Sequence, residues 1–125
     1  MLVKAGTGDL TLSGANTYTG GTRVAAGTLS LASNGALGAG AVTLDPNTTL
    51  HLAGVQIVNT VNISGDPNVA VTGANSLNSI VGSGDVHILG TSGDATTDVL
   101  TLNGPNAYTA DTFIGDGTAA AAATL

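Results

Sequence analysis

The sequence predicts an all-β fold, a single-stranded, right-handed parallel β-helix (β-solenoid) of roughly five to six coils. Three observations support this prediction. The chain contains a long internal repeat, its apolar and polar residues alternate in short segments, and its turn sequences recur about every 20 residues. We expect one unit that covers residues 1–125, because a chain of this length supplies enough material for a single domain.

The internal repeat joins two stretches that lie ninety positions apart. LTLSGANTYT at residues 10–19 returns as LTLNGPNAYT at residues 100–109, and the match extends to Gly27 and Gly117. Such a repeat indicates stacked copies of one supersecondary unit, because each copy has an apolar face that only a neighbouring copy can cover. Ninety is not a multiple of the shorter turn intervals, so some coils must carry insertions or bulges.

Strands are expected where apolar and polar residues alternate, because a strand with one buried face has a period of two. These segments are rich in Val, Leu, Ile and Thr, and none has the 3.6-residue apolar stripe of a helix. The expected strands include residues 10–12, 29–31, 42–44, 50–52, 61–63, 69–71, 86–88 and 100–102.

The turns between these segments give the length of a coil. The sequence DPN at residues 45–47 recurs at 66–68, and SGD at 64–66 recurs at 83–85. Gly, Pro, Asn and Asp are the residues that tight turns require. A unit of about 20 residues with two or three short strands is about one coil of a solenoid. The alanine-rich tail, Ala119 to Leu125, is either a degenerate last strand or a truncation.

Composition excludes several classes of partner. The formal charge is −6 and the pI near 4.1, with Lys4 and Arg23 as the only strong bases. Such a surface repels phosphate, so we expect no nucleic-acid partner and no membrane insertion. Without cysteine there is no disulfide, zinc knuckle or thiol nucleophile. No leader and no apolar run of about 20 residues is present, so we expect any export signal to lie outside this sequence.

The first copy also resembles a known family. Residues 6–29, GTGDLTLSGANTYTGGTRVAAGTL, are similar to the autotransporter-associated β-strand repeat, also called the passenger-associated transport repeat. Its running pattern is G-x-L-T-L-x-G-x-N-x-Y-x-G-x-T-x-V-x-x-G-x-L. The second copy departs from it, because Ala110 and Asp111 replace Gly20 and Gly21. The resemblance implies a fragment or small relative of a larger type V secretion passenger, secreted or displayed at the bacterial surface beyond the outer membrane.

No residues form a convincing reaction centre, and we predict no catalytic, cofactor-binding or metal-binding residues. His51 and His87 each lie between aliphatic residues, so alternation places both rings on the solvated face. Most aspartates adjoin Gly or Pro, where Asp caps its own turn. These are Asp9, Asp45, Asp66, Asp85, Asp94 and Asp116. Asp85, Asp94 and Asp98 come nearest to an acidic cluster, where a bound cation is a minor alternative.

Equivalent residues of the two copies suggest a structural corner. Asn16 and Asn106 are expected inside turns, and Tyr18 and Tyr108 over a corner of the core, with sugar stacking as the alternative. Regular Thr columns on a solenoid resemble ice-binding surfaces. Here Thr11, Thr43, Thr72 and Thr101 are interspersed with Asn and His. An ice-binding role is therefore a remote alternative.

The leading interpretation is a non-enzymatic extracellular stalk segment that assists export, folding and surface display. The open ends of a β-helix expose unpaired backbone, so we also expect self-association end to end into filaments. The first alternative is an adhesin-type module that binds carbohydrate or a host surface. A polysaccharide-acting enzyme is a remote alternative that would require several Asp in one groove.

Overall fold

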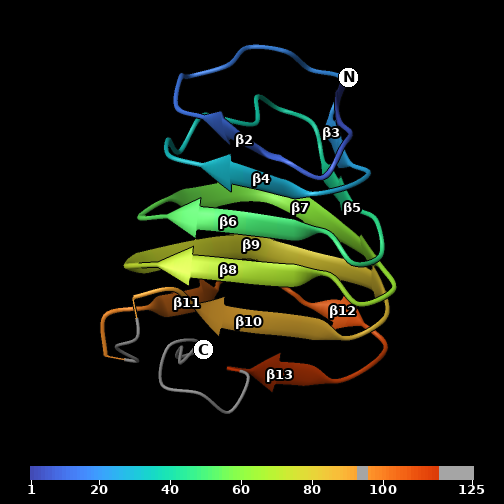
Figure 1. Cartoon of the computed structure of the whole chain (residues 1–125), viewed down its shortest axis with the longest axis vertical. Helices are drawn as coiled ribbons and strands as arrows, with labels where there is room; N and C mark the ends of the chain where they lie inside the picture. Colours follow the sequence, from blue (N-terminus) through green and yellow to red (C-terminus); the bar gives the residue numbers. More distant parts are fainter. Residues whose placement is uncertain (93–95, 116–125) are drawn as a thin grey trace.

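The computed structural model describes residues 1–92 and 96–115, which wind into a column of stacked coils (Figure 1). Its strands form two sheets, here called A and B, and every described pairing is parallel. The chain passes from sheet A to sheet B and back, which makes a β-solenoid of about five turns. Within the described ranges there is no helix. The predicted fold class is therefore confirmed.

Sheet A faces sheet B across the core, and successive strands of each sheet come from successive coils. Sheet A consists of β1 (Leu2–Lys4), β3 (Thr22–Val24), β5 (Val42–Leu44), β7 (Gln56–Ser64), β9 (Ala74–Ser83), β11 (Val99–Leu102) and β12 (Ala107–Tyr108). Sheet B consists of β2 (Asp9–Leu12), β4 (Thr28–Leu31), β6 (Thr49–Ala53), β8 (Asn68–Thr72), β10 (Val86–Gly90) and β13 (Thr112–Ile114).

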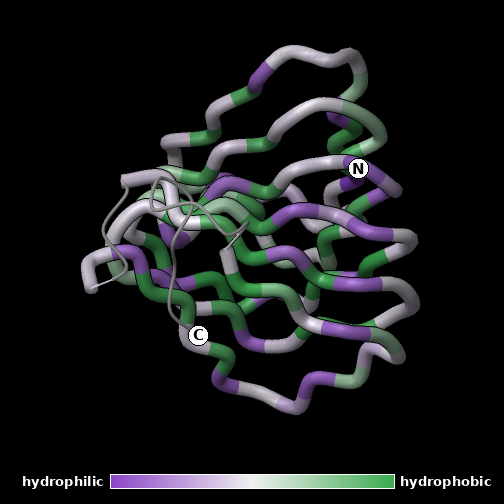
Figure 2. The backbone as a smooth tube through the Cα atoms, turned by 60° about the horizontal axis from the view of Figure 1, so that its bottom comes forward, coloured by the Kyte–Doolittle hydropathy of each residue, from purple (hydrophilic) through white to green (hydrophobic). Residues whose placement is uncertain are grey.

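The core consists of aliphatic columns that run along the axis. In sheet B, register places Leu29, Leu50, Val69 and Ile88 one above another, and all four are 0% exposed. Equivalent columns line sheet A. Apolar and polar positions alternate along each winding (Figure 2). Each fully buried aliphatic side chain contributes roughly 1.5–3 kcal/mol of burial free energy, so the columns dominate the stability of the coil stack.

The eight expected strand segments all lie within observed strands. The expected segments did not include the short strands β1, β3, β12 and β13. They also did not include the long strand β9, whose inward side chains include Asn75 and Ser79 among the apolar ones. Polar residues at inward positions weaken the alternation that identifies a strand. The expected strand in the alanine-rich tail lies outside the described residues.

Most coils keep the predicted length. Strand partners in sheet B are 21 positions apart between Ser30 and His51, and 19 between Asp66 and Asp85 at the neighbouring turn. Two irregularities interrupt this spacing. A bulge shifts the register of β7 between Ile57 and Thr60, and the last winding carries an insertion, with Asp111 bonded 26 positions back to Asp85. The predicted insertions and bulges are thus confirmed.

The two repeat copies occupy opposite sheets. In the first copy the segment around Leu10 forms β2 in sheet B, and the segment around Arg23 forms β3 in sheet A. In the second copy Leu100 lies in sheet A and Phe113 in sheet B. Ninety residues therefore correspond to about four and a half windings rather than a whole number. The repeat specifies a strand, a corner and a second strand, without specifying the sheet.

Candidate functional site

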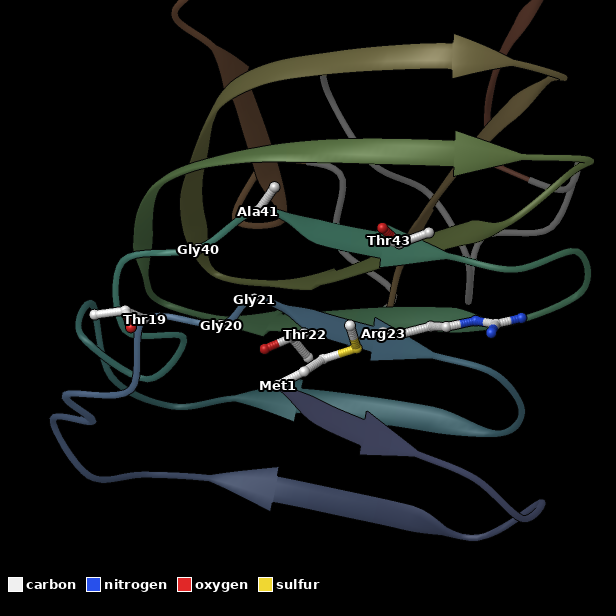
Figure 3. A pocket seen from close by; sticks show the side chains of 9 residues that line it. All are labelled: Met1, Thr19, Gly20, Gly21, Thr22, Arg23, Gly40, Ala41 and Thr43. Carbon is white, nitrogen blue, oxygen red and sulfur yellow. The ribbon is translucent and has the colours of Figure 1, made fainter.

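The larger of two described surface depressions lies at the N-terminal end of sheet A (Figure 3). Its volume is about 420 Å³. Arg23 is its one charged side chain, and in Figure 3 the guanidinium extends away from Thr19 and Gly20. The other lining residues are Met1, Thr22, Gly21, Gly40, Ala41 and Thr43. None of the lining residues carries a carboxylate or an imidazole.

Arg23 forms an ion pair with Asp45 of the next coil. Its Nη2 donates to Asp45 Oδ2 at 2.6 Å, and its Nε donates to both carboxylate oxygens at 3.1 Å. This hydrogen bonding raises the pKa of the Arg23 guanidinium and lowers the pKa of the Asp45 carboxyl. The pair links two coils at the surface, where such pairs contribute little to stability.

The second depression, of about 320 Å³, lies over β7, β9 and β11. Its lining is made of amide, hydroxyl and methyl groups, with no titratable side chain. The residues are Gln56, Ala74, Asn75, Ser76, Thr101 and Asn103. This chemistry suits hydrogen bonding to a neutral polar ligand and supplies no general acid or base.

Polar side chains link successive coils on the outer face of sheet B. We call Ser30, His51, Thr72 and Thr91 the hydroxyl–histidine ladder. The distance from Ser30 Oγ to His51 Nδ1 is 3.2 Å, and from His51 Nε2 to Thr72 Oγ1 it is 2.8 Å. The Thr72 hydroxyl contacts the Thr91 hydroxyl, which donates to the Val71 carbonyl at 3.1 Å. His51 is thereby held between two hydroxyl groups, in a structural network.

The prediction that both histidine rings face outward is confirmed. His51 belongs to the ladder, and His87 stacks on Phe113, with ring centroids 4.9 Å apart and planes inclined by 19°. His51 pairs in register with Ala70, and His87 with Asn68, so the imidazoles occupy different columns. The structure does not bring them together.

Turn aspartates form a second ladder, which sequence reasoning missed. The Asp66 carboxylate accepts from the backbone N–H of Asp85 at 3.1 Å, and the Asp85 carboxylate accepts from the N–H of Asp111 at 2.9 Å. The recurring SGD turns pointed to Asp66 and Asp85. Asp111 joins them because the insertion between β10 and β11 lengthens this winding to 26 positions. Asp45, Asp66 and Asp85 lie between strands as expected, whereas Asp9 begins β2. Contrary to the prediction, their carboxylates do not cap their own turns but bond to Arg23, Asp85 and Asp111 of neighbouring coils.

The proposed acidic cluster does not form among its described members. Asp85 belongs to the turn ladder, Asp98 lies in the insertion, and Asp94, like Asp116, is outside the described residues. Among residues 1–92 and 96–115, no group of three His or acidic side chains is placed to hold a metal ion.

Asp98 is a buried anchor, 0% exposed, at the base of the insertion. Oδ1 accepts from the Gly73 N–H at 2.9 Å, and Oδ2 accepts from the Ser92 N–H at 2.7 Å and the Ser92 hydroxyl at 2.6 Å. Burial alone would raise the pKa of the Asp98 carboxyl, but the hydrogen bonds from Ser92, Gly73 and Thr91 together lower it.

This environment makes the stability sensitive to acid. Because the pKa of Asp98 is lower in the folded chain than in the unfolded one, its stabilising effect is complete above the unfolded value of about 4. The effect is lost as the pH falls through the folded pKa. We expect Asp98→Asn to flatten the decline in urea-unfolding stability between pH 5 and 3. Asp9→Asn, at an exposed position, should keep the wild-type decline, and equal curves for wild type and Asp98→Asn would contradict this account.

The corner residues of the two copies behave as expected. Tyr18 Oη lies 2.9 Å from Thr22 Oγ1, and the same pair of atoms meets in Tyr108 and Thr112. Both side chains are half-buried, and Tyr108 packs against the core. Each hydroxyl is bonded within its own corner, as the structural interpretation predicted.

The corner asparagines bond to backbone in neighbouring coils. Asn16 Nδ2 donates to the Ala36 carbonyl of the following coil at 2.6 Å. Asn106 Oδ1 accepts from the Ile80 N–H of the preceding coil at 2.8 Å. The predicted threonines divide between sheets, with Thr11 and Thr72 in sheet B and Thr43 and Thr101 in sheet A, so they form no single array.

No stretch of the described chain is a helix with the length and apolar character required to cross a bilayer. The model of the passenger-associated-transport-repeat family matches residues 2–31 and 97–118. The chain is also similar to the adhesin BmaC autotransporter of Brucella suis biovar 1 (strain 1330). The two are 36% identical over 117 residues, or 93% of this chain, which spans 3% of the length of that relative. No solved structure matches the chain.

The family matches coincide with the two corner units that the structure defines. Each match includes a strand of the Leu-Thr-Leu segment and the Asn and Tyr that close the corner. Residues 2–31 and 97–118 are therefore passenger-associated-transport repeats, and the chain is a segment of the autotransporter-passenger type.

Proposed function

We propose that this chain is a non-enzymatic stalk segment that assists export and folding of a passenger and holds other parts of it away from the cell. Its place of action would be outside the outer membrane. The observation that carries the proposal is the unbroken aliphatic column, in which each coil is completed by its two neighbours. Such a column can form one coil at a time as a chain emerges from a pore.

The polar groups support a structural role rather than catalysis. The Asp66 and Asp85 carboxylates accept backbone N–H groups, and Asp98 is enclosed by its donors. Neither depression contains two carboxylates, or a carboxylate with an imidazole. An acid and a base in one groove are the minimum for glycoside hydrolysis.

A display experiment tests the stalk proposal. The chain would be placed between an epitope tag and the membrane barrel of an autotransporter, and the tag measured by antibody on intact cells. Leu52→Asp puts a charge at a fully buried position, whereas Ala53→Asp puts it at the exposed neighbour. We expect Leu52→Asp to lower display several-fold and Ala53→Asp to leave it unchanged, because coil stacking drives folding outside the cell. Equal display of the two variants would refute the proposal.

The second candidate is an adhesin-type module. It is favoured by the relative, which is named as an adhesin, and by the polar outer face of sheet B. Thr49, Asn68 and His87 form one outward row there, continued by the exposed Phe113. A glycan array tests this candidate, with Phe113→Ala as the variant expected to lose a hit. An array without hits would count against it.

The proposal also includes self-association, in which copies of the chain join through the ends of their columns. Both ends of the column carry apolar side chains that no described coil covers, including Met1 at 80% exposure and Ile114 at 47%. Sizing of the 125-residue chain over a range of concentrations tests this part, and we expect species larger than the monomer at high concentration.

A further inference from the structure

We infer that Asn34 is a site of covalent self-modification, at which the backbone nitrogen of Gly35 displaces the side-chain amide with help from the N–H of Gln56. The products are an aspartate or an isoaspartate at this position. The inference goes beyond the stalk function and does not depend on it. It follows from a contrast between the two Asn-Gly pairs of the chain, Asn34-Gly35 and Asn103-Gly104.

The reaction requires an Asn-Gly pair and water. The Gly35 nitrogen forms a bond to Asn34 Cγ and closes a cyclic imide, while the bond from Cγ to Nδ2 breaks. The proton of the Gly35 N–H leaves with the amide nitrogen as ammonia. Water then opens the imide at one of its two C–N bonds. Glycine favours ring closure because no Cβ crowds the attacking nitrogen.

The fold polarises the carbon that is attacked. Asn34 Oδ1 accepts from the backbone N–H of Gln56 at 2.8 Å, across to the next coil. Negative charge develops on Oδ1 as the Gly35 nitrogen adds to Cγ. A backbone N–H at this distance stabilises such a charge, as the donors of an oxyanion hole do. The first residue of β7 therefore assists the reaction of a turn one coil earlier.

The attacking nitrogen and the leaving amide are both accessible. Gly35 N–H donates to Ser33 Oγ at 3.4 Å, which is a long and weak hydrogen bond. The pair lies in the turn region between β4 and β5, and Asn34 is exposed, so water reaches the amide and the imide. Little structure has to open before the reaction begins.

The second Asn-Gly pair lacks both features. Gly104 N–H donates to the Asn78 carbonyl of the preceding coil, so this bond must break before the nitrogen can attack. Among residues 1–92 and 96–115, no donor bonds to the side chain of Asn103. Asn103 is exposed like Asn34, so access of water does not distinguish the pairs. The chain thus contains its own control.

Mass spectrometry of the wild-type chain tests the inference. The folded protein would be kept at mildly alkaline pH, and samples digested with pepsin in acid, where the reaction is slow. We expect Asn34 to convert about tenfold faster than Asn103, or more, because a ladder hydrogen bond protects Gly104. In the urea-unfolded chain the two pairs should convert at similar rates. Each conversion replaces NH2 by OH, and in water enriched in heavy oxygen the product gains the heavy isotope.

Matched variants test the role of the Gln56 N–H. Gln56→Pro removes this donor at the first residue of a strand, where proline is tolerated, and Gln56→Ser keeps it. We expect Gln56→Pro to slow the conversion of Asn34 several-fold and Gln56→Ser to leave it unchanged. Asn34→Gln should abolish the mass gain of its peptide, because its ring closure is less favourable. Circular dichroism establishes that each variant is folded.

Two results would overturn the inference. One is equal conversion of Asn34 and Asn103 in the folded wild type, including no conversion of either. The other is a folded Gln56→Pro chain that converts Asn34 at the wild-type rate. If Gln56→Pro does not fold, the comparison of the two pairs in the wild type still decides. Neither result changes the outcome of the display test for the stalk.

Discussion

Replacing Leu50 with alanine is expected to lower the free energy of unfolding by about 3 kcal/mol. Leu50 is 0% exposed and stands between Leu29 and Val69 in the central column of sheet B. Its removal leaves a cavity that neither neighbouring coil can fill, because their positions are fixed by backbone pairing. Equilibrium urea unfolding followed by circular dichroism measures this loss.

The matched control for this prediction is Leu10→Ala, which removes the same atoms from the terminal strand of the same column. Leu10 is only half-buried, so its truncation should cost clearly less than that of Leu50. Equal losses at the two positions would mean that burial in the column does not determine stability.

Gly84→Ala is expected to have a larger effect, a destabilisation of about 4 kcal/mol or more. Gly84 has a φ of +111°, which side-chain-bearing residues rarely adopt, and an added Cβ would overlap the carbonyl oxygen of Gly65 in the preceding coil. The two SGD turns stack too closely for any side chain between them. The thermal midpoint, or the yield of folded protein if the variant fails to fold, measures the effect.

Two other glycines separate conformational strain from overlap. Gly54 has a φ of +67° with no atom within 4 Å of an added Cβ, so Gly54→Ala should cost only the strain of about 1–2 kcal/mol. Gly8 has neither a positive φ nor a near neighbour, and Gly8→Ala should be close to neutral. The expected order of destabilisation is Gly84, then Gly54, then Gly8. A loss at Gly8 as large as that at Gly84 would contradict the steric explanation.

The strands could be predicted because their inward residues are almost all aliphatic, as in β4, β6 and β8. The strand β9 escaped prediction because Asn75 occupies an inward position, where its Oδ1 accepts from the buried Val55 N–H at 2.9 Å. Similarly, Asn59 turns inward at the bulge of β7 and donates to the Gly38 and Gly40 carbonyls. Such residues satisfy corner backbone from an adjacent coil, a partner that a single sequence does not reveal.

Part of the geometry of the candidate site was predictable from the sequence. Alternation predicted outward rings for His51 and His87, but the hydroxyl–histidine ladder depends on which coils stack, and therefore on the exact strand register. The burial of Asp98 was not foreseen, because the two residues before it, Thr96 and Thr97, are polar and its donor Gly73 lies 25 positions away. The insertion that brings them together changes the local coil length.

The placement of the two repeats on opposite sheets has a consequence for how such genes can grow. A unit that folds equally well on either sheet does not need to be duplicated in whole windings to keep the column intact. Unequal recombination between copies could therefore lengthen or shorten the passenger in half-winding steps, provided that the aliphatic alternation stays in phase.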